Sequence, residues 1–116
     1  MTFDHGDYAG IESIKEKDKI AAKLYKRSLQ YYPDQRAFLG LGIAKQKSSN
    51  YKQSVKILAK GLNYFSNNQQ LSLCIGISHI NLGEYKKALS YLLPFQESKE
   101  VLPYIENCHR VMDKLK

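Results

Sequence analysis

Apolar side chains recur every three to four residues along most of this chain, which is the spacing of one face of a helix. The first such run extends from Ile11 to Tyr32 and contains no glycine, asparagine or proline. Pro33 is expected to end this run, because the residue before a proline avoids the helical region. We therefore predict one long helix here, or two helices that meet near Lys17 and Asp18.

Shorter amphipathic segments follow, separated by residues that favour turns. Asp34 is suited to cap the next helix. Residues 48–50 (Ser-Ser-Asn) and 81–83 (Asn-Leu-Gly) predict tight turns, and residues 66–68 (Ser-Asn-Asn) predict a connecting loop. Pro94 lies inside the next predicted helix and should kink it or end it early.

The last segment predicts an amphipathic helix that is polar on its other face. Its apolar positions are Val101, Tyr104, Ile105, Cys108, Val111, Met112 and Leu115. The chain has only three prolines and seven glycines, and it contains few valines and threonines, so a sheet is disfavoured. The whole pattern predicts an all-α protein.

The helix–turn–helix pattern repeats along the chain. The spacing from Tyr51 to Tyr85 is 34 (85 − 51), that from Ser54 to Ala88 is also 34 (88 − 54), and Ala21 precedes Ser54 by 33. We call the spacing of 34 the repeat period. A period near 34 with helix–turn–helix content is that of the tetratricopeptide repeat. Over roughly residues 18–96 the chain resembles this family, with about two and a half repeats.

The resemblance implies an architecture of antiparallel helix–turn–helix repeats stacked as a short right-handed α-solenoid. Gly42 and Gly76 are then expected to let a neighbouring helix approach closely, with Ser54 and Ala88 opposite. The expected organisation is a flexible N-terminus (1–9) and a single domain (10–116), made of a degenerate first unit (10–33), two repeats (34–67 and 68–97) and a capping helix (98–116).

In the resembled family, the first helices of successive repeats line a concave groove that accepts a peptide or helix from a partner. Carried over by position, this partner-binding groove would contain Arg36, Leu39, Ile43, Gln46, Lys47, Gln70, Leu73, Ile77, Ile80 and Asn81. The segment 69–82 is apolar almost all round, which is more than one buried stripe requires. Its extra apolar residues face either a partner or the N- or C-terminal helix of this chain.

The expected function is therefore that of a protein–protein interaction scaffold. A homodimer built on the same face is one alternative, and a non-catalytic accessory domain cut from a larger multidomain enzyme is another. Family members that grip a chain-terminal carboxylate use a cluster of Lys, Arg and Asn. Most of the corresponding positions here are Gly, Leu, Gln or Cys, and Arg36 alone does not rebuild that clamp.

The charge distribution adds a further alternative. The formal net charge is +7, and no acidic residue lies between Asp34 and Glu84. Lys52, Lys56 and Lys60 follow each other at four-residue spacing, so they form one basic face of a helix. Such a face can track the phosphates of a nucleic acid. Lysines greatly outnumber the three arginines and no nucleic-acid motif is present, so a solvated surface is the more ordinary interpretation.

No catalytic set, metal site or cofactor site is expected. Cys74, His79, Cys108 and His109 do not have the spacing of convergent ligands, and no nucleophile motif or phosphate-binding glycine loop occurs. No run of about 18 apolar residues predicts a membrane span, and the N-terminal residues do not have the pattern of a secretory signal. We therefore expect a non-enzymatic protein of a reducing, cytoplasmic-type compartment.

Overall fold

A computed structural model describes residues 17–115, and this part of the chain is helical without strands. The predicted flexible segment 1–9 and the helical positions Ile11 and Ile14 lie outside the described residues. An N-terminal helix (residues 17–29) is followed by α2 (Gln35–Lys47), α3 (Tyr51–Tyr64), α4 (Gln69–Asn81), α5 (Tyr85–Leu92), the 3₁₀ turn η1 (Leu93–Phe95) and α6 (Leu102–Lys114). The predicted all-α fold is confirmed.

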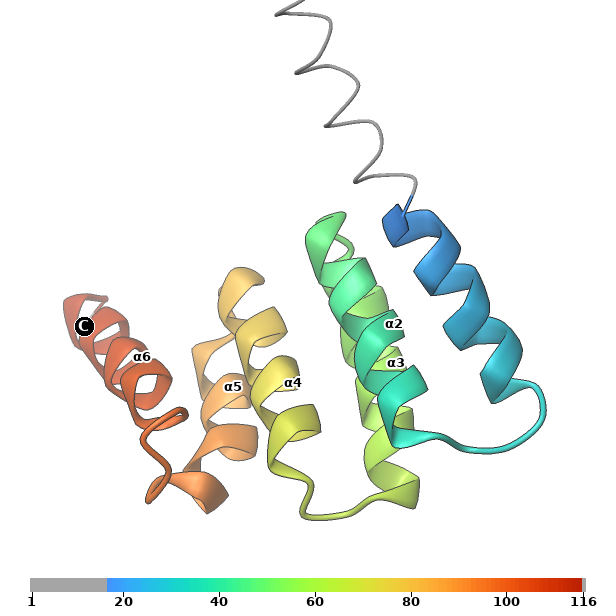
Figure 1. Ribbon diagram of the computed structural model, residues 1–116. Coiled ribbons are helices and arrows are strands. Elements are labelled where there is room, and N and C mark those ends of the chain that lie inside the picture. The colour runs from blue at the N-terminus through green and yellow to red at the C-terminus, as the bar shows by residue number, and fades with distance from the viewer. Residues whose placement is uncertain (1–16, 116) are drawn as a thin grey trace, which may run out of the picture.

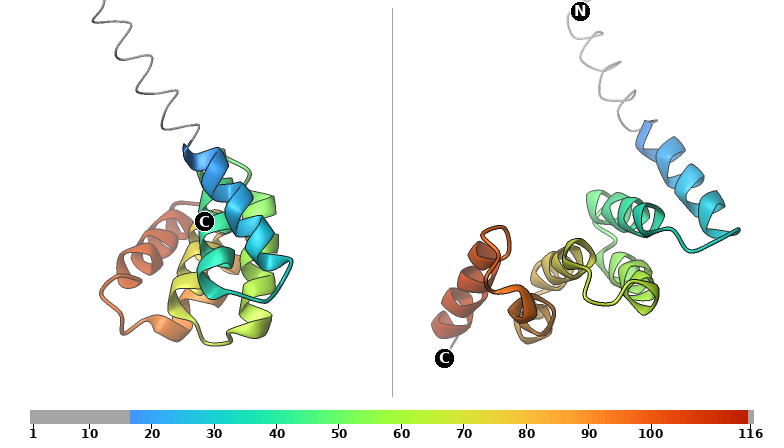
Figure 2. Two further views of the ribbon diagram at one scale, coloured as in Figure 1. Left: turned by 45° about the vertical axis from the view of Figure 1, so that its right-hand side comes forward. Right: turned by 60° about the horizontal axis from the view of Figure 1, so that its bottom comes forward.

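The helices pack in the order of the chain and form a short solenoid (Figure 1). Helices α2 and α4 lie in front of α3 and α5 in this view, and α6 follows at the C-terminal end. Seen nearly along the helix axes, α2, α4 and α6 form one row, while α3 and α5 form a second (Figure 2). We call the first row the inner row.

The helix starts recur with the repeat period of the sequence. The carboxylate Oδ1 of Asp34 accepts a hydrogen bond of 2.9 Å from the backbone N–H of Arg36, so it caps α2 as predicted. Asn68, one repeat period later, also caps its helix: its side-chain oxygen accepts a hydrogen bond of 3.0 Å from the backbone N–H of Leu71 in α4. Both caps satisfy a backbone donor that the first helical turn leaves unpaired.

The two predicted tight turns are confirmed, and they have the same backbone. Ser49 and Gly83 both have a positive φ, of 63° and 76°. In each turn the backbone N–H of the next residue donates a hydrogen bond to a carbonyl of the preceding helix. Asn50 donates to the carbonyl of Lys45 and Glu84 to that of His79, each with an N···O distance of 2.8 Å. The chain therefore reverses direction in both repeats through the same turn geometry.

The expected close approach at the glycines is also present. Gly42 lies against Leu58 and Gly76 lies against Leu92, and both leucines are fully buried. A Cβ atom added to either glycine would overlap the leucine side chain. Leu58 and Leu92 are themselves one repeat period apart, so each repeat closes on the same glycine–leucine contact.

Two apolar clusters run through the stack. The first contains Phe38, Leu58, Leu71 and Ile75 and joins α2, α3 and α4. The second contains Ala88, Leu89, Leu92, Val101, Ile105 and Cys108 and joins α5 to α6. Helix α6 thus covers the C-terminal end of the stack with one apolar face, while its other face is exposed.

Prolines set two helix boundaries. Helix α5 ends at Leu92 and continues only as the 3₁₀ turn that contains Pro94, so the predicted early ending is confirmed. The N-terminal helix ends at Leu29, three residues before the predicted end at Tyr32. Its last turn tightens before Pro33, with the N–H of Gln30 donating to Arg27 and that of Tyr31 to Ser28.

Candidate functional site

The predicted groove residues lie on the inner row, on α2 and α4. All five apolar members (Leu39, Ile43, Leu73, Ile77 and Ile80) are half-buried, and four polar members (Arg36, Lys47, Gln70 and Asn81) are exposed. Lys47 also lines a pocket between the N-terminal helix and the end of α2. The inner row is therefore a partly exposed apolar surface bordered by polar side chains.

Three half-buried residues of this surface share one register. Ile43 on α2 and Ile77 on α4 are one repeat period apart, and Val111 on α6 follows after a second period. None of the three belongs to either apolar cluster or packs against one. A half-buried aliphatic side chain outside both clusters keeps part of its apolar surface accessible, and a partner can cover that part.

The other apolar members are partly used by the fold. Leu39 packs against the first apolar cluster, and Leu73 and Ile80 pack against the second. The predicted apolar set thus divides into residues that pack against an apolar cluster and residues that pack against neither cluster. Ile43 and Ile77 are in the latter group.

Gln46 is engaged inside the fold. Its Nε2 group donates to the carbonyl of Cys74 and to the hydroxyl of Ser78, both over 2.7 Å. Ser78 donates to Ser54 over 3.1 Å, and Ser54 donates to the carbonyl of Gly42 over 2.8 Å. We call Gln46, Ser54 and Ser78 the polar junction, since together they connect α2, α3 and α4.

Three of the four residues of the polar border have a partner within the described part of the chain. Lys47 lies 3.6 Å from a carboxylate oxygen of Asp18, and the side chain of Asn81 donates to the carbonyl of Ile77 over 2.9 Å. The side-chain oxygen of Gln70 accepts a hydrogen bond of 3.1 Å from the side-chain amide of Gln35. The charged groups among the predicted groove residues are thus both positive.

The alternative basic face is exposed as the spacing indicates. Lys52, Lys56 and Lys60 are all exposed on α3, and none has an ion pair within residues 17–115. Helix α3 contains no acidic residue. The structure therefore leaves these charges to solvent or to an anionic partner.

The cysteines are positioned for packing. Cys74 and Cys108 are free thiols, and burial raises the pKa of each. A raised thiol pKa disfavours the thiolate, which is the reactive and metal-binding form. Among the described residues, no three His, Cys, Asp or Glu side chains converge as metal ligands. No helix between residues 17 and 115 is both long and apolar enough to cross a bilayer.

The sequence pattern did not indicate a side-chain cluster at the second turn. Glu84 accepts a hydrogen bond of 2.9 Å from Nδ1 of His79, and an ion pair of 3.4 Å links it to Lys87. The His79 hydrogen bond is the main reason why the pKa of Glu84 is lowered. The His79 ring also stacks on Tyr91, with ring centroids 5.7 Å apart. The only signal for this cluster in the sequence is the five-residue spacing between His79 and Glu84.

Comparisons with known proteins add no family assignment. No protein-family model matches the chain, and no curated protein matches it.

Proposed function

We propose that this chain is a tetratricopeptide-like protein-interaction scaffold that binds a peptide or helix of a partner protein across the inner row. The observation that carries the proposal is the register of Ile43 and Ile77. These residues occupy equivalent positions on α2 and α4, are half-buried, and pack against neither apolar cluster. An extended segment or a helix can reach both of them, since neighbouring helix axes lie about 8–10 Å apart.

The polar border supports a protein segment as the ligand. Arg36, Lys47, Gln70 and Asn81 offer positive charge and amide groups around an apolar centre. An apolar centre with a polar rim is the usual anatomy of a protein interface. The positive border further favours a partner segment with acidic residues beside its apolar anchors.

Affinity capture with a matched pair of variants tests this proposal. Ile77→Glu places a charge at the centre of the surface. Leu102→Glu makes the same kind of change at an exposed position at the start of α6, outside the register of Ile43, Ile77 and Val111. We expect wild type and Leu102→Glu to capture the same partner protein and Ile77→Glu to lose it. Circular dichroism must first show that both variants keep their helical content.

Two outcomes would contradict the proposal. Capture that survives Ile77→Glu but disappears after nuclease treatment would favour nucleic-acid binding through Lys52, Lys56 and Lys60. The second outcome concerns sedimentation. If the mass of wild type rises with concentration while the Ile77→Glu variant stays monomeric, the protein is a homodimer. In that case the inner row would bind a second copy of the chain.

A further inference from the structure

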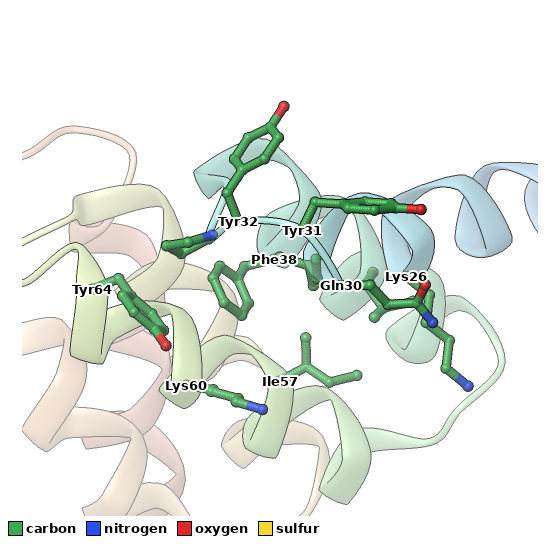
Figure 3. A pocket seen from close by; sticks show the side chains of 11 residues that line it. Lys26, Gln30, Tyr31, Tyr32, Phe38, Ile57, Lys60 and Tyr64 are labelled. Atoms are coloured by element: carbon green, nitrogen blue, oxygen red, sulfur yellow. The ribbon is translucent and has the colours of Figure 1, made fainter.

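A hollow of about 460 Å³ lies at the N-terminal end of the stack, between the N-terminal helix, the loop that follows it and α3 (Figure 3). Its apolar floor is made by Leu29, Phe38, Leu41 and Ile57. Pockets of about 300–1,000 Å³ are typical of ligand sites. Neither Ile43 nor Ile77 lines this hollow, nor does any residue of the polar border.

The same place in the next repeat is largely filled. There, between α3 and α5, the cavity is only about 210 Å³. Tyr91 and Phe95 line it, and the residues one repeat period earlier are Ile57 and Gly61. Phe38 lies against Gly61 and takes the space that Phe95 fills in the next repeat. The exchange that enlarges the first hollow is therefore Ile57 in place of Tyr91.

The placement of the N-terminal helix keeps the hollow open. In the right-hand view of Figure 2 this helix lies beside α2, apart from the row that α3 and α5 form. Tyr25 covers Gly40 of α2 so closely that a Cβ atom on Gly40 would overlap the tyrosine ring. This contact draws the N-terminal helix toward α2, and its C-terminal end contributes the far wall of the hollow.

The electrostatics of the hollow favour an anion. Lys26 and Lys60 lie on opposite sides of it, with the floor residue Ile57 between them (Figure 3). Both lysines are exposed, and neither forms an ion pair within the described part of the chain. No acidic residue lines the hollow. The equivalent cavity of the next repeat is lined by no charged residue at all.

The rim is formed by tyrosines that reach well beyond the hollow. Tyr31, Tyr32 and Tyr64 are 75%, 60% and 57% exposed. Tyr64 stacks on Phe38 with ring centroids 5.9 Å apart, so its ring extends the apolar floor outward. Exposed tyrosines around a pocket are characteristic of sites that bind a protein chain, because they add contact area at low entropic cost.

The geometry points to a second binding site, specific for an acidic segment of a partner polypeptide that inserts one large apolar side chain into the hollow. Phe38 and Ile57 receive this side chain, and Lys26 and Lys60 pair with carboxylates that flank it on the two sides. The tyrosines contact the segment outside the hollow. This site is separate from the inner row and does not depend on the function proposed for that surface.

A synthetic peptide tests the site directly. The chain contains nine tyrosines and no tryptophan, so fluorescence excited at wavelengths beyond the tyrosine absorption band reports the indole of acetyl-EEDWLEE-amide alone. We expect a blue shift on binding, because the indole enters an apolar site, and an affinity about tenfold higher than that of the neutral analogue acetyl-QQNWLQQ-amide. Circular dichroism is recorded for every variant.

Three variants locate the binding. Lys26→Glu with Lys60→Glu should weaken it about tenfold or more, whereas Lys52→Glu with Lys56→Glu, the same charge change outside the hollow, should change it by less than about threefold. Ile57→Tyr, which introduces the side chain present at position 91, should fill the hollow and abolish the blue shift. Ile77→Glu on the inner row should leave the peptide affinity unchanged.

Several results would overturn the proposal. One is the absence of binding up to about 1 mM peptide. Others are equal affinity for the neutral analogue, or equal losses in the two lysine double variants. A single-stranded oligonucleotide that binds more tightly than the peptide at the same salt concentration, and displaces it, would assign the lysines to nucleic acid.

Discussion

Three helices meet at two equivalent places inside the stack, and these two places are filled by side chains of different polarity. The polar junction, between α2, α3 and α4, consists of Gln46, Ser54 and Ser78 in one hydrogen-bonded chain. The equivalent positions one repeat period later are Ile80, Ala88 and Met112, and they pack with the second apolar cluster between α4, α5 and α6. The same helix arrangement therefore accommodates either a hydrogen-bonded polar cluster or an apolar one.

The comparison shows what a buried polar group requires here. Ser54 and Ser78 are fully buried, and among the described residues no buried side-chain nitrogen or oxygen lacks a partner. Because every donor is satisfied, the polar junction avoids the cost of an unpaired buried group. It also fixes the relative register of three helices, which an apolar contact does less specifically.

A second difference concerns side-chain volume. Phe38 lies against Gly61 in the first repeat, and the equivalent pair in the second repeat is Ser72 and Phe95. The large residue has moved from the first helix of the repeat to the 3₁₀ turn that follows its second helix. Total volume is roughly kept, which is the condition under which cores tolerate exchange.

The largest expected effects concern what the repeats share. Leu58→Ala and Leu92→Ala each remove a fully buried side chain that packs on a glycine. We expect each to lower the free energy of unfolding by about 2–5 kcal/mol. Urea titrations followed by circular dichroism measure both losses. A loss for one leucine several times larger than for the other would show that the repeats are not equivalent.

The polar junction should show strong coupling. Ser54→Ala leaves the Ser78 hydroxyl without its acceptor, and Ser78→Ala leaves Ser54 and Gln46 each short of one partner. Each single change should cost about 1–3 kcal/mol. The double variant should cost less than the sum by about 0.5–3 kcal/mol, because it removes both members of a pair. Additive losses from a double-mutant cycle would argue against a connected network.

A reciprocal exchange at the turns should give a smaller effect. Ser49 and Gly83 hold equivalent positions with positive φ, where a residue with a Cβ atom is strained. Ser49→Gly should stabilise the protein by about 1 kcal/mol, and Gly83→Ser should destabilise it by about the same amount. No heavy atom lies within 4 Å of a Cβ placed on Gly83, so the second change tests backbone strain alone. Thermal unfolding of the two variants gives the signs.

The smallest effect is a pH dependence confined to the second turn. The pKa of Glu84 is lowered from its usual value of 4.5, mainly by the hydrogen bond with His79. A lowered pKa in the folded state adds stability above pH 4.5, and this contribution is lost as the pH falls through the folded value. Glu84→Gln should reduce the loss of stability below pH 4.5. Asn50→Gln, at the equivalent position of the first turn, should leave it unchanged.

Local chemistry explains which structural features could be predicted from the sequence. The caps, turns and early end of α5 depend on side chains within a few residues, such as Asp34 and Pro94. The glycine–leucine contacts follow from the repeat period. The exposure of the lysines on α3 follows from helical spacing.

The remaining features depend on contacts between distant residues. The engagement of Gln46 with Cys74 and Ser78 requires the distance between α2 and α4, which periodicity does not contain. The hollow above Phe38 likewise depends on the contact of Tyr25 with Gly40, which sets the position of the N-terminal helix. A prediction from spacing alone assigned the lysines to one stripe and did not place Lys26 and Lys60 around an apolar floor.

The most direct test of the inner row as a partner-binding surface is site-specific photo-crosslinking. A photoreactive phenylalanine analogue replaces Ile43, Ile77 or, as the control, Lys52 on α3, and crosslinked partners are identified by mass spectrometry. We expect positions 43 and 77 to crosslink to one segment of the same partner protein and position 52 not to crosslink to it. Crosslinks that form at position 52 and are absent from both inner positions would contradict this expectation.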